Sequence, residues 1–140
     1  MSVDILLAGT TNRKEWYRLQ VEHYIKNISL MQAADGAFRI GIEPMHNPAK
    51  NARLQEGILP LAWHMSRFGT HNFRENIIAG IKYLLKLQSD NGAYPGPNGE
   101  AFGATAFITF ALAKTLEYAD PFLPDETKDS VRGAIKKALP

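Results

Sequence analysis

The sequence predicts an all-α fold of repeated helical hairpins, and two observations carry this prediction. A turn motif occurs twice, because LMQAADGAF at residues 30–38 and KLQSDNGAY at residues 86–94 are related by a shift of 56 positions (88 − 32). Apolar residues also recur at spacings of three and four, which is typical of helices with one buried face. Fixed internal periods are the signature of repeat folds. We therefore expect five helices, near residues 13–33, 49–68, 72–89, 101–118 and 126–138, with antiparallel neighbours and no sheet.

The first helix is indicated by a capping-box spacing, in which Asn12 stands three positions before Glu15. Its expected apolar face consists of Tyr17, Val21, Tyr24, Ile28 and Met31. Asp35-Gly36 should end it, because glycine readily takes the left-handed conformation that favours helix termination.

The second helix follows a loop in which Pro44 and Pro48 prevent an earlier start. The stripe expected to be buried is Leu54, Ile58, Leu61, Ala62, Met65 and Phe68. Pro60 interrupts this stripe, so we expect a kink there. Gly69 should close the helix.

The last three helices complete the pattern. Asn72 and Glu75 repeat the capping-box spacing at the start of the third helix. The fourth contains no charge between Ala101 and Ala113, which predicts a helix covered by others on most sides, with Phe102, Phe107 and Phe110 in the core. The fifth carries only a weak apolar stripe around Val131.

The predicted helices form one domain, which is preceded by a short N-terminal extension. Residues 1–12 form an N-terminal extension, and 13–140 the helical domain. Within it, 13–69 and 72–119 are the two repeat units, and 125–139 is an outer helix without a partner. Five helices of this kind leave apolar faces open. We therefore expect either a fragment that lacks C-terminal helices or a homo-oligomer, most simply a two-fold dimer.

The stretch IKYLLKLQSDNGAY, residues 81–94, resembles the repeats of the terpenoid cyclase and protein prenyltransferase superfamily. The earlier copy, residues 28–38, is looser. The resemblance implies a partial α/α toroid, in which outer helices carry the glutamine-to-glycine motif and inner helices line a cavity. Heparinase-like and alginate-lyase-like polysaccharide lyases and related glycosidases share this toroid. The acidic motifs of the cyclases and the cysteine of prenyltransferase zinc sites are absent from the sequence.

The composition excludes several classes of function and of binding site. A formal charge of +2 without a basic run does not indicate nucleic-acid binding. The chain has no cysteine, which excludes disulfides and thiolate metal sites. No apolar segment reaches membrane-spanning length and no signal peptide is evident, so we expect a soluble and preferably cytoplasmic protein. We expect no metal ion and no cofactor, because no spacing of ligand residues indicates one.

Candidate site residues lie in the loops that follow the two repeat glycines. In a toroid these loops lead into the inner helices and open onto one mouth of the cavity. We expect a saccharide, perhaps an acidic one, between residues 39–53 and 94–102. On a uronate, His46 would abstract the proton, Asn47 or Asn51 would stabilise the enolate and Arg53 would pair with the carboxylate. Further substrate-binding candidates are Arg39, Glu43, Asn51, Glu56, Tyr94, Asn98 and Glu100.

Three interpretations stay open at this point. The first is a piece of a polysaccharide lyase or glycosidase, whose isolated chain need not be active; it requires Tyr, His, Asn and Arg side chains gathered at one mouth. The second is a terpenoid cyclase-like domain, which requires Phe102, Phe107 and Phe110 to face an open central space. The third is a non-catalytic helical module that binds a partner or assembles with copies of itself.

Overall fold

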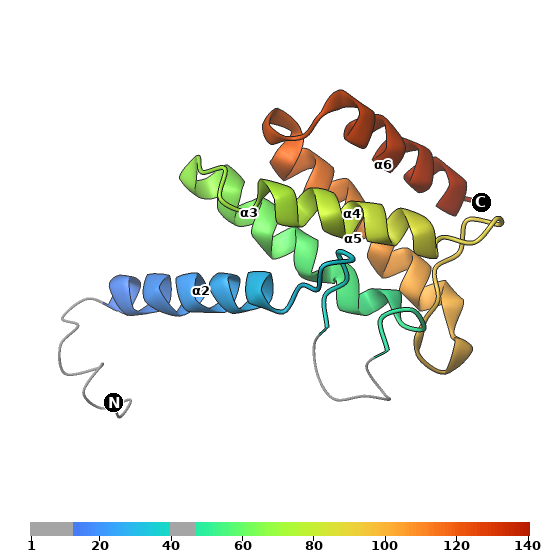
Figure 1. Cartoon of the computed structure of the whole chain (residues 1–140), viewed down its shortest axis with the longest axis horizontal. Helices are drawn as coiled ribbons and strands as arrows, with labels where there is room; N and C mark the ends of the chain where they lie inside the picture. The colour runs from blue at the N-terminus through green and yellow to red at the C-terminus, as the bar shows by residue number, and fades with distance from the viewer. Residues whose placement is uncertain (1–12, 40–46) are drawn as a thin grey trace.

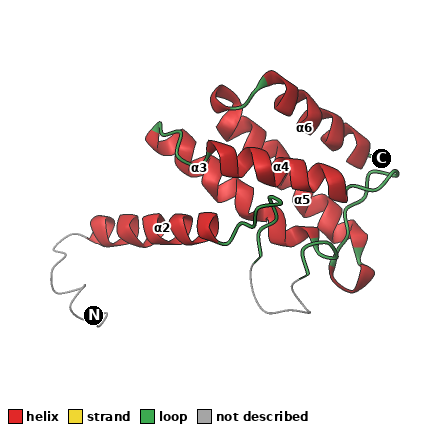
Figure 2. Cartoon of the chain, viewed as in Figure 1, coloured by secondary structure: helices red, strands yellow, loops and turns green. Residues whose placement is uncertain are grey.

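A computed structural model describes residues 13–39 and 47–140, and in these ranges the chain is helical, with no strand (Figures 1 and 2). The five α-helices are α2 (Arg13–Leu30), α3 (Ile58–Phe68), α4 (Arg74–Leu87), α5 (Ala101–Ala119) and α6 (Asp125–Ala138). Three 3-10 helices connect them, at Ala52–Gly57, Pro97–Gly99 and Asp120–Phe122. The predicted all-α class is confirmed.

The helices form two layers. Helix α3 packs against α4 and α5, α5 packs against α6, and α4 packs against α6. Helices α3 and α5 therefore make an inner layer, and α4 and α6 an outer layer. Helix α2 packs against α3. Its first turns lie away from the other helices, beside no other labelled helix (Figure 1). The arrangement is an alternating inner and outer array; closure into a toroid stays a prediction.

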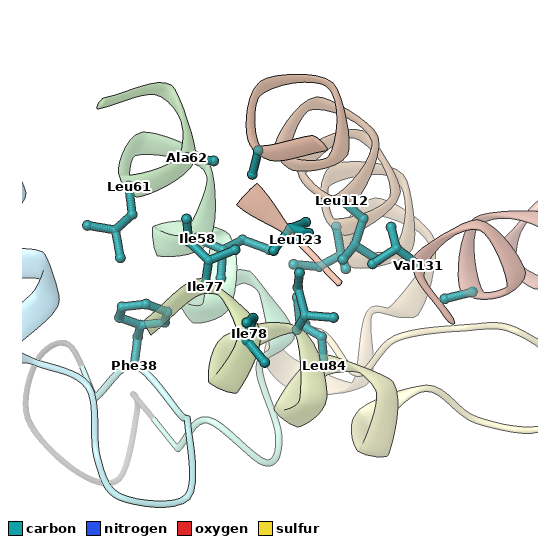
Figure 3. Close-up of a cluster of buried hydrophobic side chains, with 14 of the residues drawn as sticks. Phe38, Ile58, Leu61, Ala62, Ile77, Ile78, Leu84, Leu112, Leu123 and Val131 are labelled. Atoms are coloured by element: carbon teal, nitrogen blue, oxygen red, sulfur yellow. The ribbon is translucent and has the colours of Figure 1, made fainter. Parts of the chain in front are cut away.

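The core lies between the two layers (Figure 3). Ile58, Leu61 and Ala62 of α3 meet Ile77, Ile78 and Leu84 of α4, while Leu112 of α5 and Val131 of α6 continue the cluster. Phe38 and Tyr94, the aromatic residues that end the two turn motifs, are both fully buried. Each turn motif therefore anchors its loop in the core.

The two turn motifs form the same hydrogen bonds. Gln32 donates from Nε2 to the carbonyl of Gly36 (2.9 Å) and to the carbonyl of Asn76 in α4 (2.8 Å). Gln88 donates in the same way to Gly92 (3.0 Å) and to Ala134 in α6 (2.9 Å). Each glutamine thus closes its own turn and attaches that turn to the next outer helix. The sequence repeat is a structural repeat.

The two glycines of the motifs sit against backbone. Gly36 has φ +91° and Gly92 has φ +87°, both in the left-handed region that we predicted for them. A Cβ on Gly36 would lie 2.3 Å from the carbonyl oxygen of Ala79, and one on Gly92 would lie 1.9 Å from that of Lys137. Glycine is therefore required here for the approach of the next outer helix as well as for the turn.

Two local predictions were wrong, the undivided helix near 49–68 and the cap before α4. The helix near 49–68 is divided, with a 3-10 helix at Ala52–Gly57 before α3. Pro60 is the third residue of α3 and follows the change from 3-10 to α-helix at Ile58 by two residues. Helix α4 begins at Arg74 after Phe73, without a side-chain cap. Asn12 of the other capping box lies outside the described residues, as do residues 1–12 as a whole.

Burial of the apolar faces differs most from the prediction. On α2, Ile25 and Ile28 are buried, whereas Tyr17, Val21 and Tyr24 of the expected stripe are exposed. Phe68 of α3 is also exposed. Helix α5 is covered on one side only, because the described ranges supply no further helix in front of it. The exposed fractions of Phe102 and Phe110 are 87% and 59%, so their predicted place in the core was wrong, as it was for Phe107.

Candidate functional site

A cleft lies between the two loops that follow the repeat glycines. Its volume is about 640 Å³, and its walls are Asn47, Ala49, Lys50 and Asn51 on one side and residues 95–99 on the other. The backbone N–H of Ala52 donates to the carbonyl of Pro95 (2.8 Å), which holds the loops side by side. We refer to it below as the loop cleft.

Three predicted site residues line the loop cleft: Asn47, Asn51 and Asn98. Two of them also shape it, because the Oδ1 atom of Asn47 accepts from Ala49 N (2.9 Å) and that of Asn51 accepts from Arg53 N (3.2 Å). Asn98 has φ +57° and forms the tip of the turn. Among the described residues, the cleft therefore offers amides and Lys50, with no tyrosine, histidine or arginine in its walls.

The other predicted site residues that the structure describes lie outside the walls of the loop cleft. Arg39 pairs with Asp35 (3.0 Å), and Glu100 accepts from Gly103 N (2.7 Å) at the start of α5. Tyr94 is buried, and burial raises its pKa to about 12. Glu43 and His46 lie outside the described residues. The expected constellation of His46, Asn47 and Arg53 is therefore described only in part.

Arg53 belongs to a second surface, on the exposed side of α3 and α5. Its side chain pairs with Glu56 (2.9 Å), and its guanidinium carbon lies 3.9 Å from the ring centre of Phe107. A cation over an aromatic face at this distance is attracted by the ring quadrupole. The contact joins the 3-10 helix before α3 to the open side of α5.

This surface, which we call the inner face, contains a shallow groove of about 380 Å³. The groove is lined by Leu59, Pro60, Trp63, Phe110, Lys114 and Tyr118. Three aromatic rings from two helices thus face solvent together. Isolated apolar residues on a surface are ordinary, but a contiguous apolar patch marks a binding surface.

One pair that joins α2 and α3 was not predicted from the sequence. His64 in α3 is buried, and its Nε2 atom lies 3.1 Å from both carboxylate oxygens of Glu22 in α2. The ring packs against Phe68 and Phe73, and Nδ1 has no hydrogen-bond partner within the described ranges. The repeat contained an indirect signal, because Glu22 aligns with Ile78 (22 + 56), whose side chain is buried, whereas the side chain of Glu22 is 37% exposed.

No known protein family, no curated protein and no solved structure matches the chain. In the described part of the chain, His, Asp and Glu side chains do not gather in groups of three that would hold a metal ion. Nor does that part contain a helix with the length and apolar content needed to cross a bilayer.

Proposed function

We propose that the chain is a helical repeat domain of the toroid type whose inner face binds an elongated apolar ligand, in the chemical class of an isoprenoid or another branched hydrocarbon. The observation that carries this proposal is the groove of the inner face, where Phe110 of α5 is exposed beside Trp63 of α3; Phe102 and Phe107 are exposed on the same helix but lie outside this groove. Of the interpretations considered, the terpenoid cyclase-like one required these side chains to face open space.

The chemistry of the groove supports the same ligand class. Ligand sites are mostly apolar and aromatic, with a few polar groups that fix orientation. Trp63, Phe110 and Tyr118 supply the apolar area, and Lys114, which pairs with Glu117 (2.7 Å), stands at the edge. A hydrocarbon chain that covers these rings gains roughly 25 cal/mol for each Å² of apolar surface removed from water.

Fluorescence of Trp63 tests the proposal. The chain has two tryptophans, so a Trp16→Phe background leaves Trp63 as the only reporter. We expect farnesol or geranylgeraniol, added below its solubility limit, to shift its emission to shorter wavelength with a saturable dose dependence. The shift arises because a bound hydrocarbon displaces water from the indole.

Two matched variants show whether the groove is the site. Phe110→Ser removes a groove wall, and Phe102→Ser changes an equally exposed phenylalanine of the same helix that does not line the groove. Phe110→Ser should weaken binding about tenfold or more, and Phe102→Ser should leave it within twofold. The proposal fails if neither alcohol moves the emission, or if the two variants behave alike. Sedimentation in parallel detects a shift caused by association of two copies.

A second candidate function is saccharide binding in the loop cleft, because three asparagines and Lys50 line it. A uronate oligosaccharide would meet amide groups and one cation there. We expect such a ligand to leave Trp63 emission unchanged and to perturb amide NMR signals of residues 47–51 and 95–99. Perturbation confined to the inner face would remove this candidate.

A further inference from the structure

Two asparagines of the chain precede a glycine, and both lie between α4 and α5. They form the pairs Asn91–Gly92 and Asn98–Gly99. An asparagine in this position can lose its side-chain amide without an enzyme, because the backbone nitrogen of the next residue attacks the side-chain carbon Cγ. Glycine has no Cβ to hinder that attack. The two pairs share this chemistry, so a difference in their reactivity has to come from the fold.

The fold holds the pair Asn91–Gly92 in place. Gly92 is buried, and its N–H donates to the carbonyl of Ser89 (2.9 Å). The Oδ1 atom of Asn91 accepts from Oγ of Ser89 (2.6 Å) and from the backbone N–H of Ala93 (3.1 Å). Gln88 joins the carbonyl of Gly92 to α6. A rotation that brings the nitrogen of Gly92 to Cγ of Asn91 breaks these bonds and loosens the turn from α6.

The pair Asn98–Gly99 lies at the tip of a loop. Both residues are exposed, and a Cβ on Gly99 would meet no atom within 4 Å. Within the described ranges, the side chain of Asn98 has no hydrogen-bond partner. The N–H of Gly99 donates to the carbonyl of Gly96 (3.2 Å), a bond inside the same turn. Exposed loop tips open locally at low cost in free energy, so the nitrogen of Gly99 can reach Cγ of Asn98 while the helical layers stay folded.

We propose that Asn98 is a site of spontaneous deamidation, which adds a carboxylate to the wall of the loop cleft. Hydroxide removes the proton from the backbone nitrogen of Gly99, and this nitrogen attacks Cγ of Asn98. The new N–Cγ bond replaces the bond from Cγ to Nδ2, and the side-chain nitrogen takes up a proton and leaves as ammonia. Water then opens the succinimide ring at one of its two carbonyls. The product is an aspartate or an isoaspartate at position 98, with one water consumed and one ammonia released.

The reaction changes the charge of the loop cleft. Asn98 lines the cleft, and Lys50 on the opposite loop is the one charged side chain among the described wall residues. A carboxylate at position 98 therefore takes the formal charge of the walls from +1 to 0 (1 − 1) and that of the chain from +2 to +1 (2 − 1). An isoaspartate also lengthens the turn by one main-chain carbon. The newly made chain and the aged chain thus differ at this cleft, whatever ligand it binds.

Incubation of the whole folded chain in mildly alkaline buffer tests the proposal. Both asparagines fall in one tryptic peptide, residues 87–114, because no lysine or arginine lies between Lys86 and Lys114. Electron-transfer fragmentation of this peptide measures deamidation at positions 91 and 98 in the same spectrum, after subtraction of a sample digested at time zero. We expect position 98 to react about tenfold faster than position 91, or more, because the turn at Asn91 must first loosen from α6.

The same incubation in urea separates the effect of the fold from that of the local sequence. In the unfolded chain the two pairs should react at rates within about threefold of each other, because neither turn is then held. Asn98→Gly removes the reactive amide and keeps a residue suited to φ +57°. On isoelectric focusing, the aged parent chain should form a band more acidic by one charge, close to that of freshly made Asn98→Asp. The Asn98→Gly chain should not form this band.

Three results would overturn the proposal. The first is reaction at equal rates at positions 91 and 98 of the folded chain, since the bonds around Gly92 would then give no protection. The second is a position 98 that reacts in urea but not in the folded chain, since the loop tip would then be closed. The third is an acidic band that forms as fast in Asn98→Gly as in the parent chain, since the new charge would then arise elsewhere. Farnesol binding at Trp63 enters none of these measurements, so this proposal and the proposed function fail independently.

Discussion

Replacement of Gly92 by alanine tests whether the repeated turn fixes the position of the next outer helix. Gly92 has φ +87°, and an added Cβ would lie 1.9 Å from the carbonyl oxygen of Lys137 in the last turn of α6. Two costs follow, one from the left-handed backbone and one from the displacement of α6. The first is about 1.5 kcal/mol and the second about 2 kcal/mol, as for overpacking of a rigid core.

Gly99→Ala separates the two costs. Gly99 has φ +79°, and a Cβ there meets no atom within 4 Å. The free energy of unfolding should therefore fall by about 1.5 kcal/mol in Gly99→Ala and by about 3.5 kcal/mol in Gly92→Ala. The difference of about 2 kcal/mol corresponds to a further drop of roughly 8 °C in the unfolding midpoint for a chain of this size.

Urea and thermal unfolding followed by circular dichroism at 222 nm measure both variants. The reasoning is refuted if Gly92→Ala and Gly99→Ala lose the same stability within about 0.5 kcal/mol, because the backbone contact with α6 would then contribute nothing. Gly36→Ala offers an independent repetition, since its Cβ would meet the carbonyl of Ala79 at 2.3 Å.

Two further predictions concern buried polar groups. Burial raises the pKa of Tyr94 from 10.0 to about 12, so the native chain keeps this proton after the unfolded chain has lost it. Stability should be unaffected below about pH 10 and should fall by up to about 2.7 kcal/mol as the pH rises to about 12; chemical unfolding of Tyr94→Phe across this range should lack that part of the slope. Glu22→Ala leaves the buried His64 without the one side chain among the described residues that is hydrogen-bonded to it, and should cost about 1 to 3 kcal/mol by urea unfolding. Glu15→Ala, which removes an exposed ion pair on the same helix, should cost clearly less.

The helices and turns could be predicted because their causes are local. Periodic apolar residues define each helix, and a glycine that must adopt positive φ marks each turn, so α4, α5 and α6 begin and end within two residues of the predicted ranges. The start of α3 was harder to predict. Residues 52–57 form a 3-10 helix, and Gln55 in it accepts from the N–H of Phe38 (2.8 Å) across 17 residues.

Which faces are covered could not be predicted, because coverage depends on neighbours. The uncharged stretch of α5 indicates a helix suited to contact on every side, yet the described chain supplies contacts on one side only. The same limit applies to the candidate site. The two loops could be predicted to lie close together because each follows a repeat glycine. The Arg53–Phe107 contact and the Glu22–His64 pair could not be predicted, because neither pair is separated by the 56 residues of the repeat.

The glutamine of the repeat motif links two outer helices through its side-chain amide. One neutral Nε2 group donates to two carbonyls at once, the last of its own turn and one on the next outer helix, in both copies. Asparagine carries the same amide on a shorter side chain, a carboxylate cannot donate, and a lysine would place a charge in a part-buried position. Because this link runs from one outer helix to the next, the order of the array is fixed without any contribution from the open sides of α3 and α5. Side chains on these open sides, such as Trp63 and Phe110, therefore take no part in this link, while the glutamine and glycine of each turn hold the layers in register.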